Sequence, residues 1–163
     1  MGFASLALTD RDGLYGVPRF LAACAGHGIS PVVGAEVTVE VRGAGASPHR
    51  GHVVLLAASD RGYRSLSRLL TAYLLPPEGS PWPSAAERRS PACGLAALLE
   101  SAGSGEAGGD LVCLTGAVPF GLVPSLALSE DTGLRGKSAE VLSLLREAFG
   151  HGNVYAELSD DGT

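Results

Sequence analysis

Short apolar stretches alternate along the chain with segments in which apolar residues recur every three or four positions. Residues 5–9 form a mainly apolar run that ends in the acidic turn at residues 10–13, a pattern that predicts a buried strand followed by a loop. Residues 17–25 and 61–74 have the apolar periodicity of helices that bury one face, and Pro18 suits the first turn of the former.

The rest of the chain continues this alternation. Further strands are predicted at residues 31–33, 36–41, 53–58, 111–115 and 153–158, and further helices at residues 95–100 and 139–149. We expect Gly26 or Gly28 to end the first helix, Asp60 to cap the second, and Ser138 and Gly150 to bound the last. Strands that alternate with helices favour an α/β fold with mostly parallel strands.

Glycine and proline concentrate in two stretches. The chain has 23 Gly and 10 Pro, and residues 76–94 and 101–109 hold many of them. Such composition is typical of loops, so we predict two low-complexity insertions in a single domain. Residues 116–124 are also punctuated by Gly and Pro, and we expect a loop there.

Composition excludes several classes of protein. Hydrophobic residues make up 45% of the chain, which is enough apolar surface to exclude disorder over most of its length. Its 12 Lys+Arg and 17 Asp+Glu give a formal net charge of −5, which argues against a dedicated nucleic-acid binder. No apolar run is long enough to span a bilayer, and no secretory signal is expected. Cys24, Cys93 and Cys113 form no C-x-x-C pair, which favours reduced thiols in the cytoplasm.

Two groups of acidic residues are candidates for chemistry. Asp10 ends the first predicted strand, where α/β proteins often place binding groups, but Asp10 and Asp12 are also well suited to bind turn amides. Glu36 lies in an otherwise apolar run, and a buried carboxylate there requires a cation or a metal. A solvent-facing position, like that of Glu40 on the same alternation, is an equally good interpretation.

Two further patterns are weaker. His49 and His52 have the H-x-x-H spacing of a chelate but no helix to hold it. Gly136-Lys137-Ser138 matches the end of a phosphate-binding loop, but Asp131 replaces its required glycine. We therefore favour Ser138 as a helix cap.

Taken in order, five segments resemble the PHP (polymerase and histidinol phosphatase) domain of bacterial C-family DNA polymerases, that is, the DNA polymerase III α subunit and its error-prone relatives. These segments are ALTDRDGLYG, RFLAACAGHGI with PVVGAEV, HVVLLAASDRGYRSLSRLLT, LVCLTGA and FGHGNVYAEL. The first, with Arg11 after the aspartate, is more similar to the error-prone branch. The resemblance implies a distorted β/α barrel whose mouth binds divalent metals, typically zinc, or manganese.

The resemblance carries over to single positions. Glu36 matches a glutamate ligand and His52 a histidine ligand, whereas Arg11 stands where metal-competent members have histidine and Ala117 where they have cysteine. Asp10 is retained as a candidate ligand or as support for one. Because a guanidinium repels cations, we expect Glu36 and His52 to be vestigial ligands and the chain to hold no stoichiometric zinc or manganese. Arg11 is expected to pair with Asp10 or Glu36 instead.

The family's opening His-x-His and closing Asp-x-His motifs do not occur in the sequence. We therefore expect an incomplete PHP-type barrel over residues 1–163, without its first strand–helix unit and its C-terminal strands. The implied function is that of a PHP segment of a polymerase III α subunit or error-prone polymerase. Alone it would be a non-catalytic scaffold, since the nucleotidyltransferase palm is not in these residues. Its partners would be the rest of the polymerase and replication or repair proteins, in the cytoplasm.

Two alternatives stay open. A free-standing, metal-dependent phosphoesterase of the histidinol-phosphatase type would need more metal ligands than Glu36 and His52. A truncated, non-catalytic product would unfold in a broad, non-cooperative transition.

Overall fold

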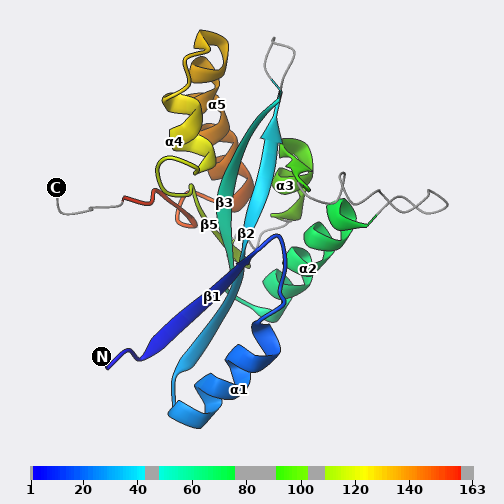
Figure 1. Ribbon diagram of the computed structural model, residues 1–163, viewed down its shortest axis with the longest axis vertical. Coiled ribbons are helices and arrows are strands. Elements are labelled where there is room, and N and C mark those ends of the chain that lie inside the picture. The colour runs from blue at the N-terminus through cyan, green and yellow to red at the C-terminus, as the bar shows by residue number, and fades with distance from the viewer. Residues whose placement is uncertain (1, 43–47, 76–90, 103–108, 159–163) are drawn as a thin grey trace.

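A computed structural model describes residues 2–42, 48–75, 91–102 and 109–158 (Figure 1). One six-stranded sheet has the order β1-β2-β3-β5-β6, and β4 pairs with β2. Its strands are β1 (Ser5–Arg11), β2 (Ser30–Val41), β3 (His49–Ala57), β4 (Cys93–Gly94), β5 (Leu111–Leu114) and β6 (Val154–Tyr155). The helices are α1 (Val17–His27), α2 (Asp60–Leu74), α3 (Leu95–Ser101), α4 (Leu122–Ala127) and α5 (Thr132–Phe149). The predicted α/β class is confirmed.

The sheet is mixed, although three of its five described strand pairings are parallel, as expected. β1 and β4 run parallel to β2, and β5 to β6, but β3 is antiparallel to both of its neighbours. β3 follows β2 in the chain after residues 42–48 alone. A short connection can join neighbouring strands only in the antiparallel sense, because a parallel pair needs a long crossover.

Two helix starts differ from the prediction. Ser59, not Asp60, caps α2, and its Oγ accepts a hydrogen bond of 3.1 Å from the Gly62 amide. Asp131, not Ser138, caps α5, which begins at Thr132. The apolar periodicity is clear only in the second half of α5, so the pattern missed its polar first turns.

The loop expected at residues 116–124 ends earlier, because residues 122–127 form α4. Pro124 lies in its first turn, where a missing amide proton costs nothing. The two predicted glycine ends are confirmed, since Gly28 caps α1 with a φ of 66° and Gly150 caps α5.

The predicted insertions fall mainly at residues 76–90 and 103–108, outside the described residues. The end of the first one is corrected by the structure. Cys93 belongs to β4, pairs with Val39 of β2, and is only 1% exposed. Residues 93–94 are therefore part of the sheet, and α3 extends through Ser101.

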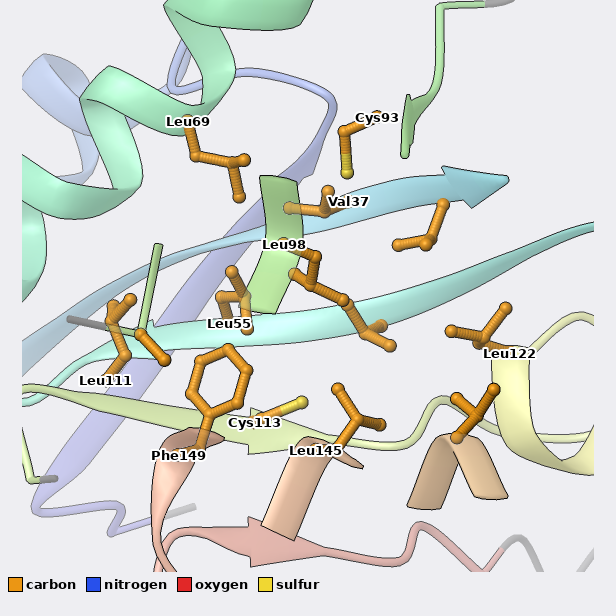
Figure 2. Packing of buried hydrophobic residues seen from close by; sticks show 14 of the residues in the cluster. Val37, Leu55, Leu69, Cys93, Leu98, Leu111, Cys113, Leu122, Leu145 and Phe149 are labelled. Atoms are coloured by element: carbon orange, nitrogen blue, oxygen red, sulfur yellow. The ribbon is translucent and has the colours of Figure 1, made fainter. Parts of the chain in front are cut away.

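The apolar core lies against one face of the sheet (Figure 2). Val37 and Val39 of β2 belong to the same buried cluster as Val53 and Leu55 of β3. The helices α2 to α5 add apolar side chains to it, including Leu66, Leu69, Leu98, Leu122, Leu145 and Phe149. Because side chains alternate along a strand, the even-numbered residues of β2 and β3 lie on the other face. Within the described ranges, every helix is too short or too polar to span a lipid bilayer.

The three cysteines are free and buried. Burial raises the pKa of both Cys93 and Cys113 to about 12, with smaller contributions from the charges of Asp12 and Glu157 respectively. We expect neither thiol to react with iodoacetamide in the native chain at pH 8, because the reactive species is the thiolate. Peptide mass analysis, with a urea-unfolded sample as the control, measures this, and equal labelling of the two samples would contradict it.

The same thiols predict a pH dependence of stability. In the unfolded chain they ionise near pH 9, whereas in the folded chain they stay protonated to about pH 12. The folded state therefore binds more protons between these limits, and the free energy of unfolding falls as the pH rises from 9 toward 12. Urea denaturation at pH 8 and pH 10 measures the change.

Candidate functional site

Strand register gathers the candidate residues on the sheet face opposite the core. Arg11 of β1 lies beside Glu36 of β2, and Thr38 of β2 lies opposite His52 of β3. Glu36 and Thr38 are two residues apart, so their side chains point to the same face. Residues from three separate strands thereby meet at one place.

A cavity of about 190 Å³ opens at this place. Arg11, Glu36 and His52 line it together with Ala117 and Glu157, and the loop of residues 116–121 forms one wall. The structure thus brings together the four positions that the resemblance singled out at residues 11, 36, 52 and 117. Asp10 does not line this cavity.

An ion pair joins Arg11 to Glu36. The Arg11 Nε and Nη2 atoms lie 2.7 and 2.6 Å from Glu36 Oε1. Of the two partners that the sequence left open for Arg11, Glu36 is therefore the one observed. The two side chains are 62% and 29% exposed, and pairs of this kind contribute at most about 1 kcal/mol to stability. The main effect of the pair is to neutralise the charge of the Glu36 carboxylate, and its contribution to the stability of the fold is small.

Two other sequence candidates have structural roles. Asp10 Oδ2 accepts a hydrogen bond of 2.6 Å from the Gly16 amide at the start of α1, as an acidic turn residue commonly does. His49 Nε2 lies 2.9 Å from Ser125 Oγ. Because three residues separate His49 from His52 in one strand, their side chains point to opposite faces and cannot form the H-x-x-H chelate.

Asp12, expected from the sequence to bind turn amides, instead reaches across to Thr38 of β2 and Tyr73 of α2. Its side chain is buried, and its backbone has a φ of 49°. Oδ1 accepts hydrogen bonds from the Thr38 amide (2.8 Å) and the Tyr73 hydroxyl (2.7 Å), and Oδ2 accepts one from the Thr38 hydroxyl (2.7 Å). On this edge of β2, pairing with β1 ends at Glu36 and pairing with β4 begins at Val39. The Asp12 carboxylate satisfies the Thr38 amide between them.

The hydrogen bonds continue from Asp12 to the cavity. Thr38 Oγ1 lies 3.3 Å from His52 Nδ1, which is 3.9 Å from Glu36 Oε1. At the other end, burial raises the pKa of Tyr73, and the hydrogen bond to Asp12 and its charge add to the shift, so the hydroxyl remains a donor. We call this series the polar line; it comprises Tyr73, Asp12, Thr38, His52, Glu36 and Arg11.

The wall at residues 116–121 packs directly on the backbone of His52. The His52 amide donates a hydrogen bond of 2.9 Å to the Phe120 carbonyl. Gly116 has a φ of +80°, and a Cβ there would lie 2.4 Å from the His52 carbonyl oxygen. Only glycine allows so close an approach, which brings the neighbouring Ala117 to the cavity.

Glu157 also lines the cavity, and it was missed from the sequence. Its Oε2 is buried and has no hydrogen-bond partner among the described residues. An acidic residue within the strand predicted at residues 153–158 was the available signal, as it was for Glu36 in its apolar run. The cavity therefore combines two carboxylates, one imidazole and one guanidinium.

These residues do not fit a divalent metal. A structural zinc site needs about four converging donors and a catalytic one three. Across the described part of the chain, no three His, Cys, Asp or Glu side chains are grouped so as to hold a metal ion. The Glu36 carboxylate is already paired with Arg11, and Ala117 contributes only a methyl group, which cannot bind a metal. The donor set is that of an ion pair beside an imidazole.

Comparison with known proteins identifies the family. Residues 1–161 match the family model of the PHP domain. The chain belongs to the PHP domain family. Three similar proteins are error-prone DNA polymerases, from Cutibacterium acnes (36% identical), Symbiobacterium thermophilum (36%) and Mycolicibacterium paratuberculosis (37%).

These matches cover 97–98% of this PHP domain but only 13–14% of each relative. The chain spans about an eighth of the length of the curated relatives it matches. It is a PHP domain homologous to one segment of error-prone DNA polymerases, as the ordered segments predicted.

Proposed function

We propose that this PHP domain is a structural, non-catalytic part of an error-prone DNA polymerase. The observation that carries the proposal is the ion pair at the cavity, in which the Arg11 guanidinium takes up the Glu36 carboxylate. Metal-competent relatives, by the resemblance, place a histidine and a cation there. In this chain the positive charge is part of the protein.

Nucleotidyl transfer would then come from parts of the polymerase outside these residues. The named relatives are polymerases about seven times longer than the segment they share with this chain, which supports that division of labour. The domain's partners would be the remainder of the polymerase and replication or repair proteins in the cytoplasm. A net charge of −5 argues against a direct role in holding DNA.

The proposed architecture is the central part of a distorted β/α barrel. The core helices lie on one face of the sheet and the cavity on the other, and the polar line connects Tyr73 of α2 to that cavity. In a β/α barrel, too, the helices cover the outside of the sheet and the binding groups lie away from them, at the mouth. The residues 76–90 and 103–108 would be insertions in this single partial domain.

A phosphoesterase assay tests the non-catalytic role. With a chromogenic phosphate monoester and added Mn²⁺, we expect the chain to give no turnover above buffer, because the cavity lacks the donors for a metal-activated water. Glu36→Ala and His52→Ala are the matched variants. Turnover by the wild type that both substitutions abolish would contradict the proposal and favour a phosphoesterase of the histidinol-phosphatase type.

A further inference from the structure

The imidazole of His52 has two nitrogens, and the polar line settles which of them carries the proton. Nδ1 faces Thr38 Oγ1 at 3.3 Å and Glu36 Oε1 at 3.9 Å. His52 lines the cavity, and its side chain is 19% exposed. Nε2 is therefore the ring nitrogen left for whatever enters the cavity.

Proton counting along the line gives the direction of each hydrogen bond. The Thr38 hydroxyl has a single proton, and it donates this proton to Asp12 Oδ2 at 2.7 Å. Toward His52 the same oxygen can then only accept. Glu36 Oε1, the other oxygen near Nδ1, belongs to a carboxylate and also accepts. The hydrogen bond with Thr38 Oγ1 therefore needs its proton on Nδ1, and the carboxylate at 3.9 Å favours the same placement electrostatically.

Asp12 has little freedom to reverse this order. Its Oδ1 already accepts from the Thr38 amide and from the Tyr73 hydroxyl, which burial keeps protonated. The Thr38 amide is a fixed donor, and it holds the carboxylate beside the hydroxyl of the same residue. The direction of each hydrogen bond is therefore fixed by the Thr38 amide, through Asp12 and the Thr38 hydroxyl, as far as the His52 imidazole.

We propose that Asp12 and Thr38 are positioning residues that favour the Nδ1–H tautomer of the His52 imidazole, in which Nε2 offers its lone pair to the cavity. The cavity, which Glu157 also lines, then presents an acceptor at His52 Nε2, while Arg11 Nε and Nη2 are directed to Glu36. A ligand that binds Nε2 donates a hydrogen bond to it. The inference does not depend on the polymerase role, since it follows from the polar line alone.

Nitrogen NMR of the full chain tests the tautomer directly. Long-range ¹⁵N–¹H correlation at pH 8.5 distinguishes a protonated from an unprotonated ring nitrogen, and the signal absent from His52→Gln assigns the residue among the four histidines. The expected wild-type result is a protonated Nδ1 and an unprotonated Nε2. A wild-type His52 with its proton on Nε2, or a chain without a dispersed amide spectrum, would overturn the proposal.

Variants of Thr38 and Asp12 separate positioning from mere structural support. Thr38→Val removes the hydroxyl at constant shape, and we expect the ratio of Nδ1–H to Nε2–H to fall about tenfold, the effect of one ordinary hydrogen bond. Thr38→Ser should restore it. Thr71→Val is the matched control, because the Thr71 hydroxyl bonds to the Ser67 carbonyl in α2. An unchanged ratio in folded Thr38→Val would overturn the proposal.

Asp12→Asn gives a second, independent arm. An amide at residue 12 can donate to Thr38, which frees the hydroxyl proton for His52 Nδ1 and reverses the tautomer. Retention of the Nδ1–H form in folded Asp12→Asn would also overturn the proposal. None of these results changes the Arg11–Glu36 ion pair, so failure here is distinguishable from failure of the proposed function.

Discussion

Phe149→Ala is expected to lower the free energy of unfolding by about 3–5 kcal/mol, the usual cost of deleting a fully buried aromatic ring. Phe149 is 1% exposed at the end of α5 and belongs to the single buried cluster shown in Figure 2. The whole free energy of unfolding of a native protein is only about 5–15 kcal/mol, so the variant should be close to unfolding. Urea denaturation followed by circular dichroism measures the change.

Phe120→Ala provides the matched control. Phe120 is 68% exposed in the loop beside His52, and its contribution to the core is small. We expect its removal to cost less than about 1 kcal/mol. Similar losses for the two variants would show that α5 does not pack on the sheet as described.

Asp12→Ala is expected to cost about 3–5 kcal/mol as well, because it removes a buried carboxylate that accepts three hydrogen bonds. Their donors are the Thr38 amide, the Thr38 hydroxyl and the Tyr73 hydroxyl. The substitution also places alanine at a φ of 49°, which aspartate tolerates better. The same denaturation measurement applies.

Asp10→Ala is the comparison that isolates the effect of burial. Asp10 accepts one hydrogen bond, from the Gly16 amide, and its loss should cost about 1 kcal/mol. If Asp10→Ala proved as damaging as Asp12→Ala, the acidic turn as a whole, and not the buried carboxylate, would hold β1 to β2.

These predictions assume a cooperative transition. The sequence alone allows a truncated product that unfolds broadly, but the structure joins α2 to α5 and the sheet in one continuous cluster. A continuous core favours a single transition. A sharp sigmoidal urea curve is the expected result for the wild type.

The spacing of apolar residues along the chain was enough to predict most helices and strands, because each of these elements buries one face. The helix at residues 61–74 and the strand at residues 53–58 are visible in the spacing of leucine, valine and tyrosine. α4 was missed because a short helix that contains Pro124 has the composition of a turn. The start of α5 was missed because its first turns are polar and depend on the cap at Asp131.

The candidate site was predictable only through resemblance, and only in part. Arg11, Glu36, His52 and Ala117 come from four separate segments, and spacing alone places none of them together. Thr38 and the partners of Asp12 were missed because they depend on strand register. The gap between β1 and β4 on the edge of β2 exposes one amide, and no local pattern indicates where such a gap falls.

Metal content tests the central claim most directly, which is that a guanidinium has replaced the cation of this site. The chain, purified without chelators and with Zn²⁺ and Mn²⁺ supplied in the growth medium, is subjected to elemental analysis alongside Glu36→Ala. We predict far less than one zinc or manganese ion per chain in both samples, because Arg11 occupies the carboxylate. One tightly held metal ion per wild-type chain, lost in Glu36→Ala, would contradict the account.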